Sequence, residues 1–136
     1  MANMKIEDIE GIGPAYGEKL RDAGIKDTDA LLASCKTKKG RDTIAEQTGL
    51  SGKLILTWTN MADLFRIKGV GPEYAELLEA AGVDTVKELR TRNAINLQAK
   101  MAEVNAEKNL TRRVPTETDV TGWIGQAGDL PPMIEH

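Results

Sequence analysis

Residues 11–32 read GIGPAYGEKLRDAGIKDTDALL, and the stretch returns over residues 69–90 as GVGPEYAELLEAAGVDTVKELR. The two stretches align without a gap, so that Gly11 falls on Gly69, and nine of the aligned positions are identical. Both begin with a glycine, an apolar residue, a second glycine and a proline, and both carry a tyrosine at the second position after that proline. Self-similarity at a fixed spacing indicates that one structural unit is used twice.

The similarity continues past these stretches at a larger offset. Trp58 and Ala62 return as Trp123 and Ala127, which are further apart in the chain than the two glycine-rich stretches are. The second copy therefore carries about seven extra residues, which we place between residues 94 and 115. We expect the chain to consist of three parts: a first unit over residues 1–64, a second unit over residues 65–128 and a C-terminal tail over residues 129–136.

Helices are expected throughout both units. Pro14 and Pro72 directly follow the second glycine, and proline suits the first turn of a helix because its missing N–H would have no partner there. From each proline, apolar residues recur at helical spacing as far as Gly24 and Gly82, which are typical of helix C-termini. No segment shows the alternation of apolar and polar residues that predicts a strand. We therefore predict an all-α protein with about five short helices in each unit.

The composition limits the classes of function. The chain has 18 Lys and Arg against 21 Asp and Glu, a net charge of −3, which argues against a protein that coats nucleic acid by charge alone. Aromatic residues make up 4%, too few for a surface on which several bases stack. Trp58 and Trp123 lie on the apolar stripes of their helices, so we interpret them as core anchors rather than as ligand-stacking residues.

Cys35 is the only cysteine and His136 the only histidine. No intramolecular disulfide, cysteine-rich zinc site or histidine-based triad can be built from them, and we predict no catalytic residue, no metal and no cofactor. No apolar run approaches the roughly 18 residues of a membrane span, and the polar start is unlike a signal peptide. We expect a cytoplasmic protein that is not an enzyme and has no membrane partner.

Function is most readily placed in two turns, the first glycine turn (Gly11–Gly13) and the second glycine turn (Gly69–Gly71). Two glycines around one apolar residue allow the backbone to reverse tightly, with the apolar side chain directed inward. Such a turn leaves backbone N–H groups pointing outward at a helix N-terminus, where they can bind one phosphate of a nucleic-acid backbone. Contacts of this kind recognise the strand without reading its bases.

These turns resemble helix-hairpin-helix motifs. The first unit is similar to the N-terminal helix-hairpin-helix module of archaeal and eukaryotic recombinases, and the tandem arrangement resembles a bacterial family of uncharacterised helix-hairpin-helix domains. The resemblance covers about residues 4–128. It implies two SAM-like helical units that bind DNA backbone weakly and without base preference, and it implies no catalysis.

Charged residues distinguish the two turns. DNA-binding members of this motif class usually carry Lys or Arg just after the turn, where this chain has Ala15 and Glu73. Acidic residues at positions 7, 8 and 10 surround the first glycine turn, whereas Arg66 and Lys68 precede the second, so we expect the second turn to be the stronger binder. The predicted nucleic-acid-binding residues are Gly11, Ile12, Gly13, Arg66, Lys68, Gly69, Val70 and Gly71 in and beside the turns, and Lys38, Lys39 and Arg41 in the densest basic run.

An alternative from a different class remains open: a helical protein–protein interaction or scaffolding module that does not bind nucleic acid. The acidic balance and Glu73 favour this alternative, whereas the glycine turns favour DNA. The predicted partner is therefore DNA backbone or another protein. The oligomeric state and any preference for single-stranded or duplex DNA stay open.

Overall fold

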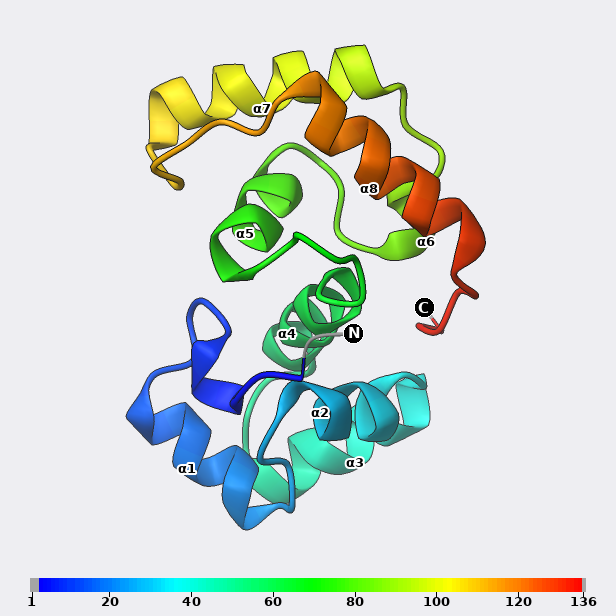
Figure 1. The fold of residues 1–136 in the computed structure, drawn as a ribbon. Helices are drawn as coiled ribbons and strands as arrows, with labels where there is room; N and C mark the ends of the chain where they lie inside the picture. The colour runs from blue at the N-terminus through cyan, green and yellow to red at the C-terminus, as the bar shows by residue number, and fades with distance from the viewer. Residues whose placement is uncertain (1–2, 136) are drawn as a thin grey trace. The chain divides into compact units, whose positions relative to one another are not determined.

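The computed structural model describes residues 3–135 (Figure 1). Within that range the protein is all-α, as the sequence predicts, and it contains no strand. In chain order the elements are a 3-10 turn η1 (Ile6–Asp8) and the helices α1 (Pro14–Asp22), α2 (Thr28–Cys35), α3 (Lys38–Thr48), α4 (Gly52–Leu64), α5 (Pro72–Ala80), α6 (Val86–Leu89), α7 (Ala94–Lys108) and α8 (Glu117–Asp129). No helix of the described range is both long and apolar enough to cross a membrane.

The chain forms two compact units. The first comprises residues 3–63 together with 133–135, and the second comprises residues 64–132. In the first unit α2 and α3 run side by side; in the second, α7 packs against α5 and α8, and α6 packs against α8 (Figure 1). Residues 133–135, which the sequence placed in a separate tail, therefore belong to the first unit.

Most of the helices begin at a side chain that caps the first turn. Thr116 accepts a hydrogen bond from the Asp119 N–H at 3.0 Å, and the Asp119 carboxylate accepts one from the Thr116 N–H at 3.0 Å, which together form a capping box. Side chains cap α2, α3, α4, α6 and α7 as well, namely those of Asp27, Thr37, Ser51, Thr85 and Asn93. The helices α1 and α5 have no side-chain cap.

The repeated apolar positions fill the core of each unit. Leu20 and Ile25 in the first copy and Leu78 and Val83 in the second are at most 1% exposed. Burial of such side chains contributes roughly 1.5–3 kcal/mol each, and helices this short are marginal in isolation. Packing against the core, rather than helix propensity, therefore holds the elements that carry the glycine turns.

The extra residues of the second copy lie mainly in and after α7. This helix has 15 residues where α3 has 11, and the connection to α8 spans residues 109–116 where the corresponding connection in the first copy spans 49–51. The insertion therefore falls where the sequence placed it, and it leaves the glycine turns and their immediate supports unchanged.

Candidate functional site

Each glycine turn directly precedes a helix, the first before α1 and the second before α5. The opening glycine of each turn is left-handed, with φ of 91° at Gly11 and 99° at Gly69. The middle residue closes the turn: the N–H of Ile12 donates to Ile9 O and that of Val70 to Ile67 O, both at 3.1 Å. Both middle side chains are buried, which confirms the prediction that they point inward.

The amides of both glycines in each turn are without a protein acceptor in the described part of the chain. The closing glycines are the N-cap residues of α1 and α5, and having no side chain they cannot cap the helix themselves. Pro14 and Pro72 at the next position have no N–H to satisfy. Three of these four glycines are exposed and Gly71 is half-buried. Each turn therefore carries two unpaired backbone N–H groups at the protein surface.

A tryptophan lies behind each turn. Trp58 of α4 is 2% exposed and Trp123 of α8 is 5% exposed, so the prediction that both are core residues is confirmed. Each ring packs against a tyrosine on the helix that follows the glycine turn. The Trp58 and Tyr16 ring centroids are 5.3 Å apart and those of Trp123 and Tyr74 are 5.2 Å apart, with interplanar angles of 52° and 54°. The same aromatic pair thus supports the turn in both units.

The indole nitrogen of each tryptophan is the atom nearest the Cβ position of the opening glycine. A Cβ atom at Gly11 would lie 3.7 Å from Trp58 Nε1, and a Cβ atom at Gly69 would lie 3.1 Å from Trp123 Nε1. The sequence revealed the apolar stripe that buries these rings, but nothing in it indicated which edge of the ring meets the glycine.

Acidic residues next to the first glycine turn are partly neutralised. The Glu7 carboxylate accepts hydrogen bonds from Arg21 Nε at 2.7 Å and Nη2 at 2.6 Å. The hydrogen bond from Arg21 is the main reason that the pKa of Glu7 falls to about 2. Asp8 and Glu10 are both exposed and make no ion pair among the described residues. The repulsive field that the sequence assigned to three carboxylates is therefore carried by Asp8 and Glu10.

Beside the second glycine turn, Lys68 and Arg66 have different surroundings. Lys68 is exposed, and its backbone is held by Gln126 of α8, whose side chain accepts from the Lys68 N–H at 2.8 Å and donates to Lys68 O at 3.0 Å. Arg66 is only 7% exposed, and it donates from Nη2 to Pro131 O at 2.7 Å. The sequence interpretation of Arg66 as a nucleic-acid-binding residue is thus corrected, because its guanidinium binds a backbone carbonyl inside the second unit rather than facing a ligand.

The basic run at residues 36–41 belongs to the connection between α2 and α3 and to the start of α3, not to the elements that form a glycine turn. Lys39 is exposed, and Lys38 forms an exposed ion pair with Asp42 at 3.3 Å. Both lysines keep the surface position that the sequence predicts.

The prediction that Arg41 binds nucleic acid is also corrected, since its side chain is buried and the residue is 5% exposed. It donates to the carbonyl oxygens of Cys35 at 3.0 Å, Lys36 at 3.3 Å and Glu135 at 2.6 Å. The first two are carbonyls at the C-terminus of α2, where the helix itself supplies no donor, and the planar guanidinium suits several acceptors at once. Arg41 therefore holds residues 133–135 on the first unit instead of presenting a charge to solvent.

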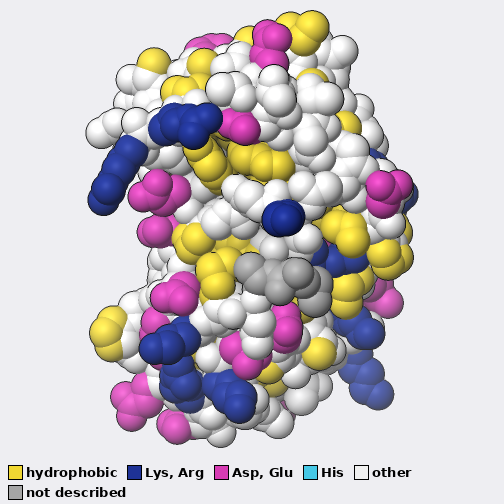
Figure 2. All heavy atoms as spheres, in the orientation of Figure 1, with side chains coloured by type: hydrophobic (Ala, Val, Ile, Leu, Met, Phe, Trp, Pro, Cys, Tyr) yellow, Lys and Arg dark blue, Asp and Glu magenta, His cyan; other side chains and the backbone are white. Residues whose placement is uncertain are grey.

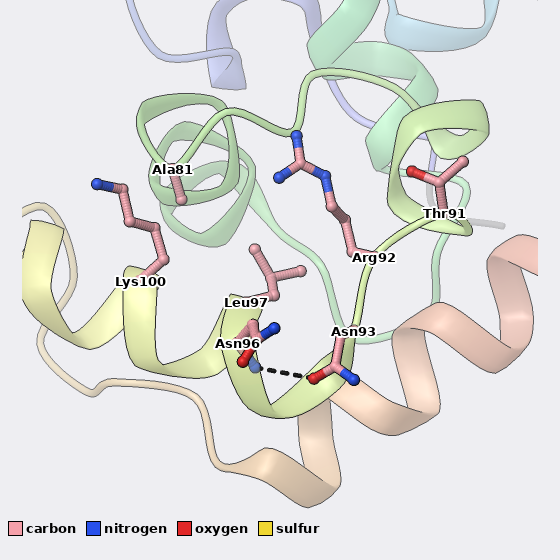
Figure 3. Close-up of a pocket in the computed structure, with 7 residues that line it drawn as sticks. All are labelled: Ala81, Thr91, Arg92, Asn93, Asn96, Leu97 and Lys100. Atoms are coloured by element: carbon pink, nitrogen blue, oxygen red, sulfur yellow. Dashed lines mark hydrogen bonds between the residues drawn. The ribbon is translucent and has the colours of Figure 1, made fainter.

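Two hollows lie away from the glycine turns. A cavity of about 190 Å³ in the second unit is lined by Ala81, Thr91, Arg92, Asn93, Asn96, Leu97 and Lys100. Figure 3 shows Arg92 and Lys100 on opposite sides of it. Arg92 donates to Glu88 Oε1 and Gly82 O, both at 2.9 Å. The second hollow, about 280 Å³ in the first unit, is lined by Lys38, Arg41, Asp42, Gly52, Lys53 and Leu56.

Cys35 is fully buried in the first unit. Burial raises the pKa of its thiol to about 11, so at neutral pH the thiolate that would act as a nucleophile is scarcely populated. Within residues 3–135 no group of three or more His, Cys, Asp or Glu side chains is arranged to hold a metal ion.

The fold and the two turns define a class of all-α protein in which an uncapped helix follows a glycine turn twice. Residues 10–130 match the family model described as a domain of unknown function, DUF4332. Because the match covers most of the chain and includes both glycine turns, the protein belongs to the DUF4332 family. No solved structure matches the chain.

Proposed function

We propose that each unit is a helix-hairpin-helix module and that the protein binds DNA backbone through its glycine turns, without reading bases and without catalysing a reaction. One observation carries this proposal. Side chains cap all the other α-helices of the described range, whereas α1 and α5 begin at a glycine with unpaired amides. An anion at these positions would accept hydrogen bonds from the glycine amides and would stand at helix N-termini that have no side-chain acceptor of their own.

Phosphate suits such a turn because the partial positive charge at a helix N-terminus adds to the amide hydrogen bonds. The amides bind phosphate oxygens, which are the same at every nucleotide, so no base preference is expected. Binding should be weak, since the chain carries a net charge of −3 and non-specific binders have dissociation constants of about 10⁻⁴ to 10⁻⁶ M.

The charges beside the second glycine turn make it the stronger candidate for phosphate binding. Its neighbour Lys68 occupies the repeat position of Glu10, which favours an anion at the second turn. Glu73 stands where the first copy has Ala15, and this carboxylate opposes the anion. With Arg66 turned inward, the preference for the second turn rests on Lys68.

Fluorescence anisotropy with labelled random duplex and single-stranded DNA at low salt tests the proposal. We expect log K to fall with log salt by roughly 0.9 for each duplex phosphate that is neutralised. No binding up to about 100 μM protein at low salt would overturn the proposal, since non-specific DNA binders have dissociation constants of about 100 μM or lower.

Substitution of the closing glycine isolates the turn. Gly71 has an extended backbone, with φ of −98° and ψ of −171°, and a Cβ there would have no atom within 4 Å. Gly71→Val should therefore fold normally while its branched side chain shields the amides, and it should weaken binding. Gly122→Val on α8, where a Cβ also has open space, is the matched control and should leave binding unchanged.

Charge at the turn can be separated from net charge by two variants of α5. Glu73→Lys places a cation in the first turn of the helix, whereas Glu79→Lys makes the same change in net charge near its other end, roughly 9 Å further along. We expect the first variant to bind DNA more tightly than the second. Equal tightening would mean that binding follows the overall charge and not the turn.

The charge distribution favours a second candidate, a protein–protein interaction module. Arg41 and Arg66 donate hydrogen bonds to backbone carbonyls, and Figure 2 shows acidic side chains close to basic ones on the surface in view. Absence of DNA binding, together with a specific protein partner whose binding survives Gly71→Val, would favour this function over the first.

A further inference from the structure

We infer that the indole N–H of the tryptophan behind each glycine turn is a further ligand of the bound phosphate. Trp58 Nε1 would serve the first glycine turn and Trp123 Nε1 the second. The inference rests on the proposed DNA binding and adds a side-chain donor to a site otherwise made of backbone amides.

Each indole is enclosed, yet its nitrogen has no partner within the described part of the protein. Trp58 and Trp123 are 2% and 5% exposed, and neither Nε1 makes a hydrogen bond to any other described residue. Among the described residues, the fully enclosed side-chain nitrogen or oxygen atom without a partner is Asn60 Oδ1, so each Nε1 reaches solvent. An indole N–H in a buried ring normally finds an acceptor. Here no described residue supplies the acceptor, so it is either water or a bound ligand.

The nitrogen of each indole lies close to the opening glycine of its turn. The 3.7 Å and 3.1 Å separations from the Cβ positions of Gly11 and Gly69 place the nitrogen beside the residue whose own amide is unpaired. Any side chain at Gly69 would lie against Trp123 Nε1. Glycine thus leaves space beside the indole nitrogen that any other residue would fill with its Cβ.

The arrangement occurs in both units although their sequences differ around it. The segment between glycine turn and tryptophan is longer in the second copy than in the first, yet the second copy has kept the contact between them. Tyr16 and Tyr74 hold the two rings at nearly the same tilt. The indole nitrogen therefore lies beside the opening glycine in both units.

The chain has two tryptophans, so a ¹H–¹⁵N spectrum of the full protein contains two indole signals. In a titration with a short random DNA duplex at low salt, we expect both signals to move downfield with the bound fraction. The Gly13→Val, Gly71→Val double variant should leave both signals in place under the same conditions.

Replacement of each tryptophan by benzothienylalanine tests the role of the N–H in affinity. This analogue keeps the size of the ring but puts sulfur in place of N–H. Loss of one hydrogen bond to a phosphate should weaken DNA binding about tenfold or more, while the thermal unfolding of the variant stays close to that of the native chain.

The outcomes separate this inference from the proposed function. If the native chain does not bind DNA at low salt, both fall together. If it binds and the benzothienylalanine proteins bind equally well, the indole N–H is not a ligand and this inference alone is overturned. Weaker binding by a folded analogue, with a downfield shift of the indole signals of the native chain, supports it.

Discussion

Glu7 and Arg21 form a bidentate ion pair in the first unit, and the second copy has neither the glutamate nor the arginine at the equivalent positions. The carboxylate receives hydrogen bonds at 2.6 and 2.7 Å. At the equivalent positions of the second copy stand Phe65 and Glu79. The two units thus use different contacts to attach the segment before the turn to the helix after it.

The pair predicts a pH dependence of stability that depends on Glu7. The pKa of Glu7 lies at about 2 in the folded chain against an ordinary value of 4.5, mainly because Arg21 hydrogen-bonds the ionised form. A lowered folded pKa means that this stabilisation is complete above pH 4.5 and is lost as the pH falls towards 2. Glu7→Gln should lower the unfolding temperature at pH 7, and the difference should shrink as the pH falls to about 2. Thermal unfolding of both proteins across this range checks it; a difference that persists unchanged in acid would contradict it.

The side chain of Glu7 occupies the space that a Cβ atom at Gly17 would need. A Cβ atom at Gly17 would come within 2.5 Å of Glu7 Oε2 and 2.9 Å of Glu7 Cγ, whereas the second copy has Ala75 at this position. Gly17→Ala should therefore displace the Glu7 side chain from Arg21, offsetting the gain of about 1 kcal/mol from better helix propensity. In a Glu7→Ala background the same substitution should stabilise by roughly 0.5–1 kcal/mol. Denaturant unfolding of the four proteins gives this comparison, and equal effects in both backgrounds would exclude the coupling.

Arg41 is predicted to be a structural residue of the first unit. Its removal leaves the carbonyls of Cys35, Lys36 and Glu135 without this donor, so Arg41→Ala should destabilise the unit by about 2 kcal/mol. Hydrogen exchange should also show lost protection of the Glu135 amide, which donates to Lys36 O at 2.7 Å. Lys39→Ala, an exposed neighbour, is the control and should change stability by less than about 0.5 kcal/mol. Equal effects of the two variants would contradict the assignment.

Sequence reasoning found the elements whose signals are local. The prolines at the first turn and the glycines after the helices each act within a few positions, and the structure has them where the pattern predicts. The inward direction of Ile12 and Val70 also followed from the turn itself. Local chemistry therefore predicted the all-α fold and the position of both glycine turns.

The orientations of long side chains were not accessible in the same way. Arg41 and Arg66 were interpreted as surface cations because a charged residue usually is one, but Glu135 O and Pro131 O, which accept from them, belong to distant parts of the sequence. The apolar stripe placed Trp58 and Trp123 in the core without giving the ring orientation that turns Nε1 to the glycine. These features depend on contacts between distant segments, which spacing along the sequence does not encode.

The two glycines of each turn are predicted to have separate roles. Gly11 and Gly69 adopt φ of 91° and 99°, where other residues are strained, so alanine there should cost about 1–2 kcal/mol of stability. Gly69→Ala should cost more than Gly11→Ala, because its Cβ would lie 3.1 Å rather than 3.7 Å from the tryptophan nitrogen. It should also change the fluorescence of Trp123.

Gly13 and Gly71 have extended backbones and open space at the Cβ position. Alanine at either should leave the unfolding temperature nearly unchanged, because any residue adopts this conformation. Thermal unfolding and DNA titration of the four single variants measure both properties on the same proteins. If the opening glycines were replaced at no cost in stability while the closing glycines were not, the turn geometry described above would be wrong. If the closing positions tolerate alanine but lose DNA binding with valine, the requirement there is access to the amides rather than backbone conformation.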